Sequence, residues 1–251
     1  LAIDSNIQNF IQDLTSEFVP QQVYGYESIV KNTIIKCIPW KSLSLESNNN
    51  TYSNLLKPCR GILIYGQTGS GKTSIATRIA YEMRHEFKFL SISCAEMIHK
   101  VVGESEKRLS QLFAAARSMA PCFLLLDNIE VMLGITPTNN QTNFYNDNKK
   151  NKRTKRRGGH RTSHHAIDRL LSTLLMEIDG IQSNSLYNDD SNENKLENCV
   201  IVIATSLCHP FELDSALVRP GRLEEHIEIL PPNQEQIQEI LNGLQSDHSI
   251  L

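Results

Sequence analysis

The stretch that most constrains the fold is the eight-residue run G-Q-T-G-S-G-K-T at 66–73. It matches the phosphate-loop pattern G-x-x-x-x-G-K-[S/T] at every position. An apolar, partly β-branched run precedes it at 61–65, and a segment with apolar residues at helical spacing follows it at 74–84. In this strand–loop–helix order, glycines let backbone N–H groups close around an anion at the positive end of a helix. The sequence therefore predicts a nucleotide-phosphate site formed by Gly66, Gln67, Thr68, Gly69, Ser70, Gly71, Lys72, Thr73 and Ser74.

Two side chains of this loop and one downstream carboxylate are predicted to act on the nucleotide and its metal. Lys72 would reach the β- and γ-phosphates, and the Thr73 hydroxyl would be a magnesium ligand. The apolar run 122–126 predicts a buried strand that delivers Asp127 at its carboxyl end, where open α/β sheets place ligand-binding groups. A carboxylate there can hold the magnesium of a bound nucleotide through water. The predicted cofactors are ATP or ADP and Mg²⁺, with Thr73 and Asp127 as the metal residues.

The rest of the chain alternates strand and helix patterns. Further strands are predicted at 87–92 and 226–230, and the apolar run 199–204 predicts another buried strand. Apolar residues at helical spacing predict a buried helix over 166–181, a short helix over 213–218 and another helix from 234. Strands that alternate with helices predict an α/β fold with a parallel sheet covered on both faces.

Length and composition set limits on the class of protein. The 251 residues are 40% hydrophobic, enough for a globular core, and the net charge of -3 favours no particular partner. The chain starts at Leu1 without a methionine, which suggests an excised fragment. Its start lacks the layout of a secretory signal, and no apolar run approaches the ~18 residues of a membrane span. The six cysteines form no C-x-x-C pair, and Cys94, Cys122 and Cys199 sit in or at the start of apolar runs, which indicates buried thiols in a reducing compartment. An intracellular location, cytoplasmic or nuclear, is therefore expected.

Two polar insertions, at about 134–165 and 182–198, interrupt the pattern. Segments this polar cannot bury enough apolar surface to order themselves, so we expect mobile loops. The first carries a basic cluster at 149–157. The cluster could be a nuclear-import patch or a nucleic-acid contact; we favour the interpretation of a solvated loop.

Four motifs together resemble the AAA ATPases, in the branch that includes valosin-containing protein and NSF. They are G-Q-T-G-S-G-K-T at 66–73, V-V-G-E-S-E at 101–106, L-L-L-D at 124–127 and L-D-S-A-L-V-R-P-G-R-L at 213–223. The resemblance implies a P-loop NTPase with a five-stranded sheet in the order 5-1-4-3-2 and a small helical lid after it. It also implies a homo- or hetero-hexameric ring that uses ATP hydrolysis to remodel proteins. The implied domains are a flanking helix or linker at 1–22, the nucleotide-binding domain at 23–233 and the beginning of a truncated lid at 234–251.

Further site residues follow from this resemblance. Arg219 and Arg222 match arginine fingers that reach the γ-phosphate held by a neighbouring subunit, and Gly25 matches a glycine segment near the adenine. The family places Asn in a polar sensor after the fourth strand; here Ser206 or Cys208 stands near that place, and Ser206 is assigned to the nucleotide site.

The chain departs from the family pattern where the water-activating glutamate would stand, because Asn128 follows Asp127. An amide cannot take a proton, so the site lacks its expected general base. Glu130 matches a usually acidic position two residues on, and the sequence does not say whether it reaches the same water. The predicted catalytic set is Asp127, Asn128, Glu130, Arg219 and Arg222.

A second departure lies in the loop that usually offers an aromatic residue for gripping a threaded polypeptide, which here reads Val101-Val102-Gly103. Two interpretations therefore stay open. The chain is an ATP-binding module of a ring-forming remodelling ATPase, with hydrolysis slowed by Asn128, or it is a hydrolysis-deficient structural or regulatory subunit. The sequence names no protein substrate or adaptor.

Overall fold

The computed structural model describes residues 23–37, 59–98, 103–135, 161–186 and 199–248, with 161–164, 182–186 and 247–248 described as helix only. Its centre is a five-stranded sheet, all of whose neighbouring strands pair in parallel, in the order β2-β3-β4-β1-β5. The strands are β1 (Gly61–Gly66), β2 (Lys88–Ser93), β3 (Cys122–Asp127), β4 (Val200–Ser206) and β5 (Glu225–Ile229). This order, read from the other edge, confirms the predicted 5-1-4-3-2 sheet of a P-loop NTPase.

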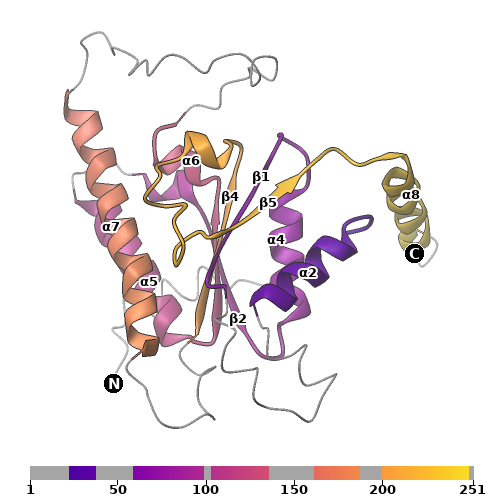
Figure 1. Ribbon diagram of the computed structural model, residues 1–251, viewed down its shortest axis with the longest axis horizontal. Helices are drawn as coiled ribbons and strands as arrows, with labels where there is room; N and C mark the ends of the chain where they lie inside the picture. Colours follow the sequence, from indigo (N-terminus) through magenta and orange to yellow (C-terminus); the bar gives the residue numbers. More distant parts are fainter. Residues whose placement is uncertain (1–22, 38–58, 99–102, 136–160, 187–198, 249–251) are drawn as a thin grey trace.

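Helices cover both faces of the sheet (Figure 1). The α-helices are α2 (Glu27–Cys37), α4 (Lys72–Glu82), α5 (Glu104–Ser118), α6 (Ile129–Met132), α7 (Arg161–Leu186) and α8 (Gln234–His248). Two 3₁₀ turns, η1 (Cys94–Met97) and η2 (Pro210–Glu212), follow β2 and β4. In Figure 1, α5 and α7 lie on one side of the sheet, and α2 and α4 lie on the other.

The sheet separates two hydrophobic cores. Along β1, Leu63 packs into the core that α5 and α7 complete, whereas Ile62 and Ile64 pack into the core of α2 and α4. All three side chains are fully buried, because both faces of a parallel sheet are covered by helices. This double burial explains why the central strands β1, β3 and β4 are continuous apolar runs, whereas the edge strands β2 and β5 alternate polar and apolar residues.

Helix α7 is longer than the sequence predicts. It spans Arg161–Leu186, whereas apolar spacing supports only 166–181, and Ile181 is the last core residue among the positions whose burial is described. Once a helix has nucleated on a packed face, each further residue adds a backbone hydrogen bond without needing burial of its own. Residues 161–165 of the first predicted insertion and 182–186 of the second are therefore helical, whereas 134–135 form the end of a turn after α6. Residues 136–160, with the basic cluster at 149–157, and 187–198 lie outside the described residues.

The helix predicted over 213–218 is wrong: the segment is a series of turns. Asp214 Oδ1 accepts the Ala216 N–H at 2.8 Å, and the Asp214 carbonyl accepts the Leu217 N–H at 2.9 Å. A short polar side chain that bonds nearby backbone favours a turn over a helix, and Pro220 restricts the residue before it. Leu213, Leu217 and Leu223 still pack into the core, so the apolar spacing reflected burial rather than helix.

Other predictions fall outside the described residues, namely the flanking helix at 1–22 and the valines at 101 and 102. The six cysteine thiols are all free and buried, which confirms the prediction made for Cys94, Cys122 and Cys199 and extends it to the other three. None of the helices in the described ranges combines the length and apolar character needed to cross a membrane.

Candidate nucleotide-binding site

The predicted phosphate loop connects the end of β1 to the start of α4. Gly66 has φ 154°, and a Cβ there would lie 2.4 Å from the carbonyl oxygen of Ile229 at the end of β5. Gly71 is the N-cap of α4 with φ 89°. Both positions require glycine, the first because another backbone approaches it and the second because of its left-handed conformation. The loop therefore keeps a shape in which α4 points its N-terminus toward the ends of the strands.

Lys72 lies inside this loop. Its Nζ donates to the Gly66 carbonyl at 3.0 Å and to the Gln67 carbonyl at 2.7 Å, and the residue is only 6% exposed. Burial lowers the pKa of Lys72, while the negative charges of Glu130 and Asp127 oppose that shift. The buried Ser70 hydroxyl has no hydrogen-bond partner among the described residues. An ammonium group, an unpartnered hydroxyl and a helix N-terminus form a donor set that fits nucleotide phosphates.

Asp127 receives three hydrogen bonds at the end of β3. Its Oδ1 accepts from the Thr73 hydroxyl at 2.8 Å and from the Thr205 hydroxyl at 2.5 Å, and its Oδ2 accepts from Asn128 Nδ2 at 3.2 Å. The two residues predicted to hold magnesium, Thr73 and Asp127, are thus in direct contact although they are 54 positions apart. Hydroxyl and carboxylate oxygens are ligands that suit Mg²⁺. The residues present therefore fit a magnesium–nucleotide complex.

Asn128 has an unusual backbone. Its φ and ψ are both 58°, and it is the one non-glycine residue with positive φ in the described part of the chain. Asn tolerates this left-handed region better than most side chains. The backbone N–H donates to Thr205 Oγ1 at 2.9 Å while the side-chain amide donates to Asp127. The amide group is thus directed to its neighbouring carboxylate.

Glu130, in the single turn of α6, points into the protein. The residue is 1% exposed, and neither carboxylate oxygen has a hydrogen-bond partner among the described residues. Its charge acts on Lys72, where it opposes the effect of burial. It also acts on Cys208, whose pKa burial chiefly raises, to about 11, with the charges of Glu212 and Glu130 adding to the shift. The structure thus buries Glu130 near these groups, and its reach to the attacking water stays a prediction.

Thr205 is a site residue that sequence reasoning missed. The polar sensor was assigned to Ser206, but the Ser206 hydroxyl accepts from the Cys208 N–H at 3.0 Å in a buried local turn. The preceding residue, Thr205, is the one that reaches Asp127 and Asn128. Successive strand residues face opposite ways, so the two hydroxyls cannot serve the same side of the sheet. The available signal was a threonine that ends an apolar strand beside the strand of Asp127. Contact of Ser206 with a nucleotide stays a prediction.

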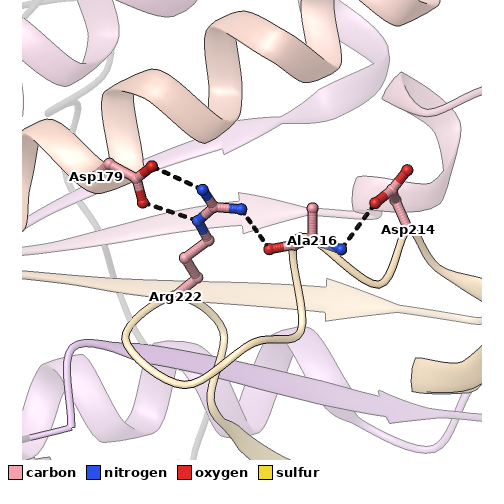
Figure 2. A network of polar contacts seen from close by, with 4 residues as sticks. All are labelled: Asp179, Asp214, Ala216 and Arg222. Carbon is pink, nitrogen blue, oxygen red and sulfur yellow. Dashed lines mark hydrogen bonds and ion pairs between the residues drawn. The ribbon is translucent and has the colours of Figure 1, made fainter.

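The two predicted arginine fingers differ in their surroundings. Arg219 is exposed and has no ion pair with any residue that the structure describes. Arg222 is held by Asp179 of α7 through two hydrogen bonds, and its third nitrogen donates to the Ala216 carbonyl at 2.6 Å (Figure 2). The hydrogen bond with Arg222 lowers the pKa of Asp179. Arg222 therefore binds within its own subunit, and only Arg219 extends from the turn toward solvent.

Gly25 lies against α8, far along the chain. Its φ is +78°, its carbonyl accepts from Gln236 Nε2 at 2.9 Å, and a Cβ there would lie 3.1 Å from the Gln236 carbonyl oxygen. Tyr26 also donates its hydroxyl to the Leu230 carbonyl at 3.0 Å. These contacts join the segment before α2 to the start of α8. The role of Gly25 beside an adenine stays a prediction.

A phosphate loop after β1, a carboxylate at the end of β3 and a parallel sheet between two helical layers define a P-loop nucleotide-binding protein. The family model for the ATPase family associated with various cellular activities (AAA) matches residues 62–230. The chain belongs to this family, in the branch that includes valosin-containing protein and NSF.

Several characterised relatives are similar to the chain. The cell division cycle protein 48 homolog of Archaeoglobus fulgidus is 36% identical over 185 residues, which cover 74% of this chain and 20% of that protein. The ATPase family gene 2 protein of Saccharomyces cerevisiae is 34% identical over 200 residues, 79% of this chain and 20% of that protein. The human peroxisomal ATPase PEX1 is 32% identical over 194 residues, 77% of this chain and 12% of that protein. The chain thus spans a fifth or less of the length of these relatives.

Proposed function

We propose that this chain is the Mg-ATP-binding AAA module of a ring-forming, protein-remodelling ATPase whose hydrolysis is slow. The proposal is carried by one observation, the contact between Thr73 and Asp127 beside a buried Lys72. This contact brings the two magnesium-type oxygens to the entrance of the phosphate loop. When bound there, magnesium would neutralise phosphate charge and help to orient the nucleotide.

Slow hydrolysis follows from the side chain at 128. The attacking water needs a group that accepts its proton, and the Asn128 amide both lacks that capacity and donates to Asp127. Glu130 is the nearby carboxylate that could replace it, but its oxygens are buried. A base that must first become accessible gives a slow or conditional reaction.

The second candidate is a hydrolysis-deficient structural or regulatory module that uses bound ATP to hold its place in a ring. Asn128 favours it, since nothing at that position can activate water. The exposed Arg219 favours an active ring, because an arginine that reaches a neighbour's γ-phosphate stabilises charge in phosphoryl transfer. We favour a hexameric ring of identical or related subunits; the protein substrate or adaptor is not implied by any described contact.

The first experiment measures equilibrium ATP binding to the full-length protein with Mg²⁺ present. Lys72→Ala removes the ammonium group inside the loop and should weaken binding by at least about tenfold, because hydrogen bonds to charged groups are worth about 1.5–3 kcal/mol. Lys107→Ala, an exposed lysine of α5, is the matched control and should bind like the wild type. Wild-type protein without measurable ATP affinity would refute the proposal. Single-turnover hydrolysis then separates the two candidates.

A further inference from the structure

A buried threonine hydroxyl ends an otherwise apolar strand. Thr205 is the last residue but one of β4, after a run from Val200 to Ala204, and it is 0% exposed. Burying a hydroxyl without a hydrogen bond costs about 1–3 kcal/mol, so its partners indicate why it is there. In the sheet, β4 lies between β1, which carries the phosphate loop, and β3, which carries Asp127.

The direction of both hydrogen bonds at this hydroxyl is determined by its partners. The backbone N–H of Asn128 can only donate, so Thr205 Oγ1 accepts from it at 2.9 Å. An ionised carboxylate can only accept, so the single Thr205 proton goes to Asp127 Oδ1 at 2.5 Å. The Thr205 hydroxyl thus donates to Asp127 and accepts from Asn128, the two consecutive residues that follow the apolar part of β3.

These bonds fix the orientation of the carboxylate. Asp127 Oδ1 is shared between Thr73 and Thr205, and Oδ2 is held by the Asn128 amide. The left-handed backbone of Asn128 directs its N–H to Thr205, which holds the turn after β3 against β4. Without the Thr205 hydroxyl, Asp127 would keep only contacts from two side chains that themselves lie at the nucleotide site.

We propose that Thr205 is a positioning residue that orients Asp127 for magnesium and fixes the left-handed turn at Asn128. It acts through Asp127 and contacts neither nucleotide nor metal itself. This inference rests on the proposed binding of Mg-ATP, and it predicts that Thr205 contributes to the part of ATP affinity that depends on magnesium. The phosphate loop between β1 and α4 should still supply the part of the ATP affinity that does not depend on magnesium.

The experiment measures ATP affinity of the full-length protein with Mg²⁺ and with EDTA. Thr205→Val keeps the shape of the side chain and removes both hydrogen bonds, whereas Thr205→Ser keeps the hydroxyl. Thr33→Val is the matched control, since Thr33 is a buried threonine whose hydroxyl donates to the Ile29 carbonyl within α2. Thermal unfolding of every variant accompanies the binding data, and Thr205→Ala serves as a second removal if the valine variant does not fold.

We expect Thr205→Val to reduce the magnesium-dependent gain in ATP affinity about tenfold, the size typical of a lost hydrogen bond to a charged group. Its affinity in EDTA should match the wild type, and Thr205→Ser and Thr33→Val should keep the full gain. A valine variant that keeps the gain would overturn the inference, as would valine and alanine variants that both lose folding or their affinity in EDTA. Wild-type protein that binds no ATP in either buffer would instead refute the proposed function, and the inference with it.

Discussion

The guanidinium of Arg222 forms a two-point ion pair with the carboxylate of Asp179, with Nε donating to Oδ1 at 2.8 Å and Nη2 donating to Oδ2 at 2.7 Å. The two residues are 43 positions apart, and the pair connects the turn before β5 to helix α7 (Figure 2). The same guanidinium bonds the Ala216 carbonyl, so it also fixes the turns that follow η2. The ion pair therefore sets the position of the turn that carries Arg219.

Asp179→Asn should destabilise the fold modestly and in a pH-dependent way. Because the carboxylate is half exposed, we expect a loss of about 0.5–1 kcal/mol at pH 7. The pKa of Asp179 is lowered in the folded protein by the hydrogen bond with Arg222. The stabilisation is thus complete above the unfolded pKa of about 3.9 and disappears as the pH falls through the lower folded value.

Urea unfolding at neutral and at strongly acidic pH measures this effect. The difference in unfolding free energy between wild type and Asp179→Asn should be largest at neutral pH and shrink in acid. Asp168→Asn, an exposed aspartate on the same helix, is the control. Equal stability of wild type and Asp179→Asn at neutral pH would show that the ion pair contributes nothing.

Substitution of Arg219 should affect ATP hydrolysis, whereas substitution of Arg222 should affect thermal stability. Arg219→Ala should leave stability unchanged, because the side chain is exposed, and should lower hydrolysis in the assembled ring about 10³-fold or more if it reaches the neighbouring γ-phosphate. Arg222→Ala should lower the melting temperature, because it leaves Asp179 and the Ala216 carbonyl without their partner. ATPase assays and thermal unfolding on the full-length protein measure both, with Arg84→Ala on the surface as control. An Arg219 variant with wild-type turnover would exclude it as a finger.

Two glycine substitutions in the phosphate loop should distinguish a steric clash with a neighbouring backbone from the strain of a positive φ alone. Gly66→Ala places a Cβ 2.4 Å from the Ile229 carbonyl oxygen, so the loop must shift away from β5. Gly69→Ala also has a positive φ, of 79°, but meets nothing within 4 Å. We expect Gly66→Ala to abolish ATP binding and Gly69→Ala to cost about 1 kcal/mol of backbone strain. Similar ATP affinities for the two variants would contradict this account of the loop.

Local patterns predicted the fold well because the decisive features are local. The strand–loop–helix order around 66–73 lies within one continuous segment, and the central strands β1, β3 and β4 are apolar runs that both helical layers bury. The sheet order followed from the resemblance and is confirmed by the observed pairing. The contact of Thr73 with Asp127 also follows from this topology, since Asp127 ends β3 and Thr73 lies in the first turn of α4, directly after the loop that follows β1.

Other features depend on register and on distant partners, which the sequence does not reveal. Thr205 contacts Asp127 because Ala204 pairs with Leu126, and a shift of one residue would have presented Ser206 instead. The ion pair of Arg222 with Asp179 could not be read from spacing, because Asp179 lies on a distant helix, and the finger role of Arg222 stays a prediction. The prediction of a helix at 213–218 is wrong because the buried leucines of this segment recur at the spacing typical of a helix.

The measurement that tests the central claim most directly is single-turnover ATP hydrolysis by the full-length protein, for wild type, Asn128→Glu, Asn128→Gln and Glu130→Gln. The account predicts that wild type binds ATP but hydrolyses it slowly and that Asn128→Glu accelerates the step about 10²-fold, the usual contribution of a general base. This factor is at the low end of the range for general-base catalysis, because glutamate must adopt the left-handed backbone beside Asp127. Asn128→Gln, which keeps an amide, should stay slow. Fast hydrolysis by the wild type that Glu130→Gln abolishes would contradict the claim and make Glu130 the base of an active motor.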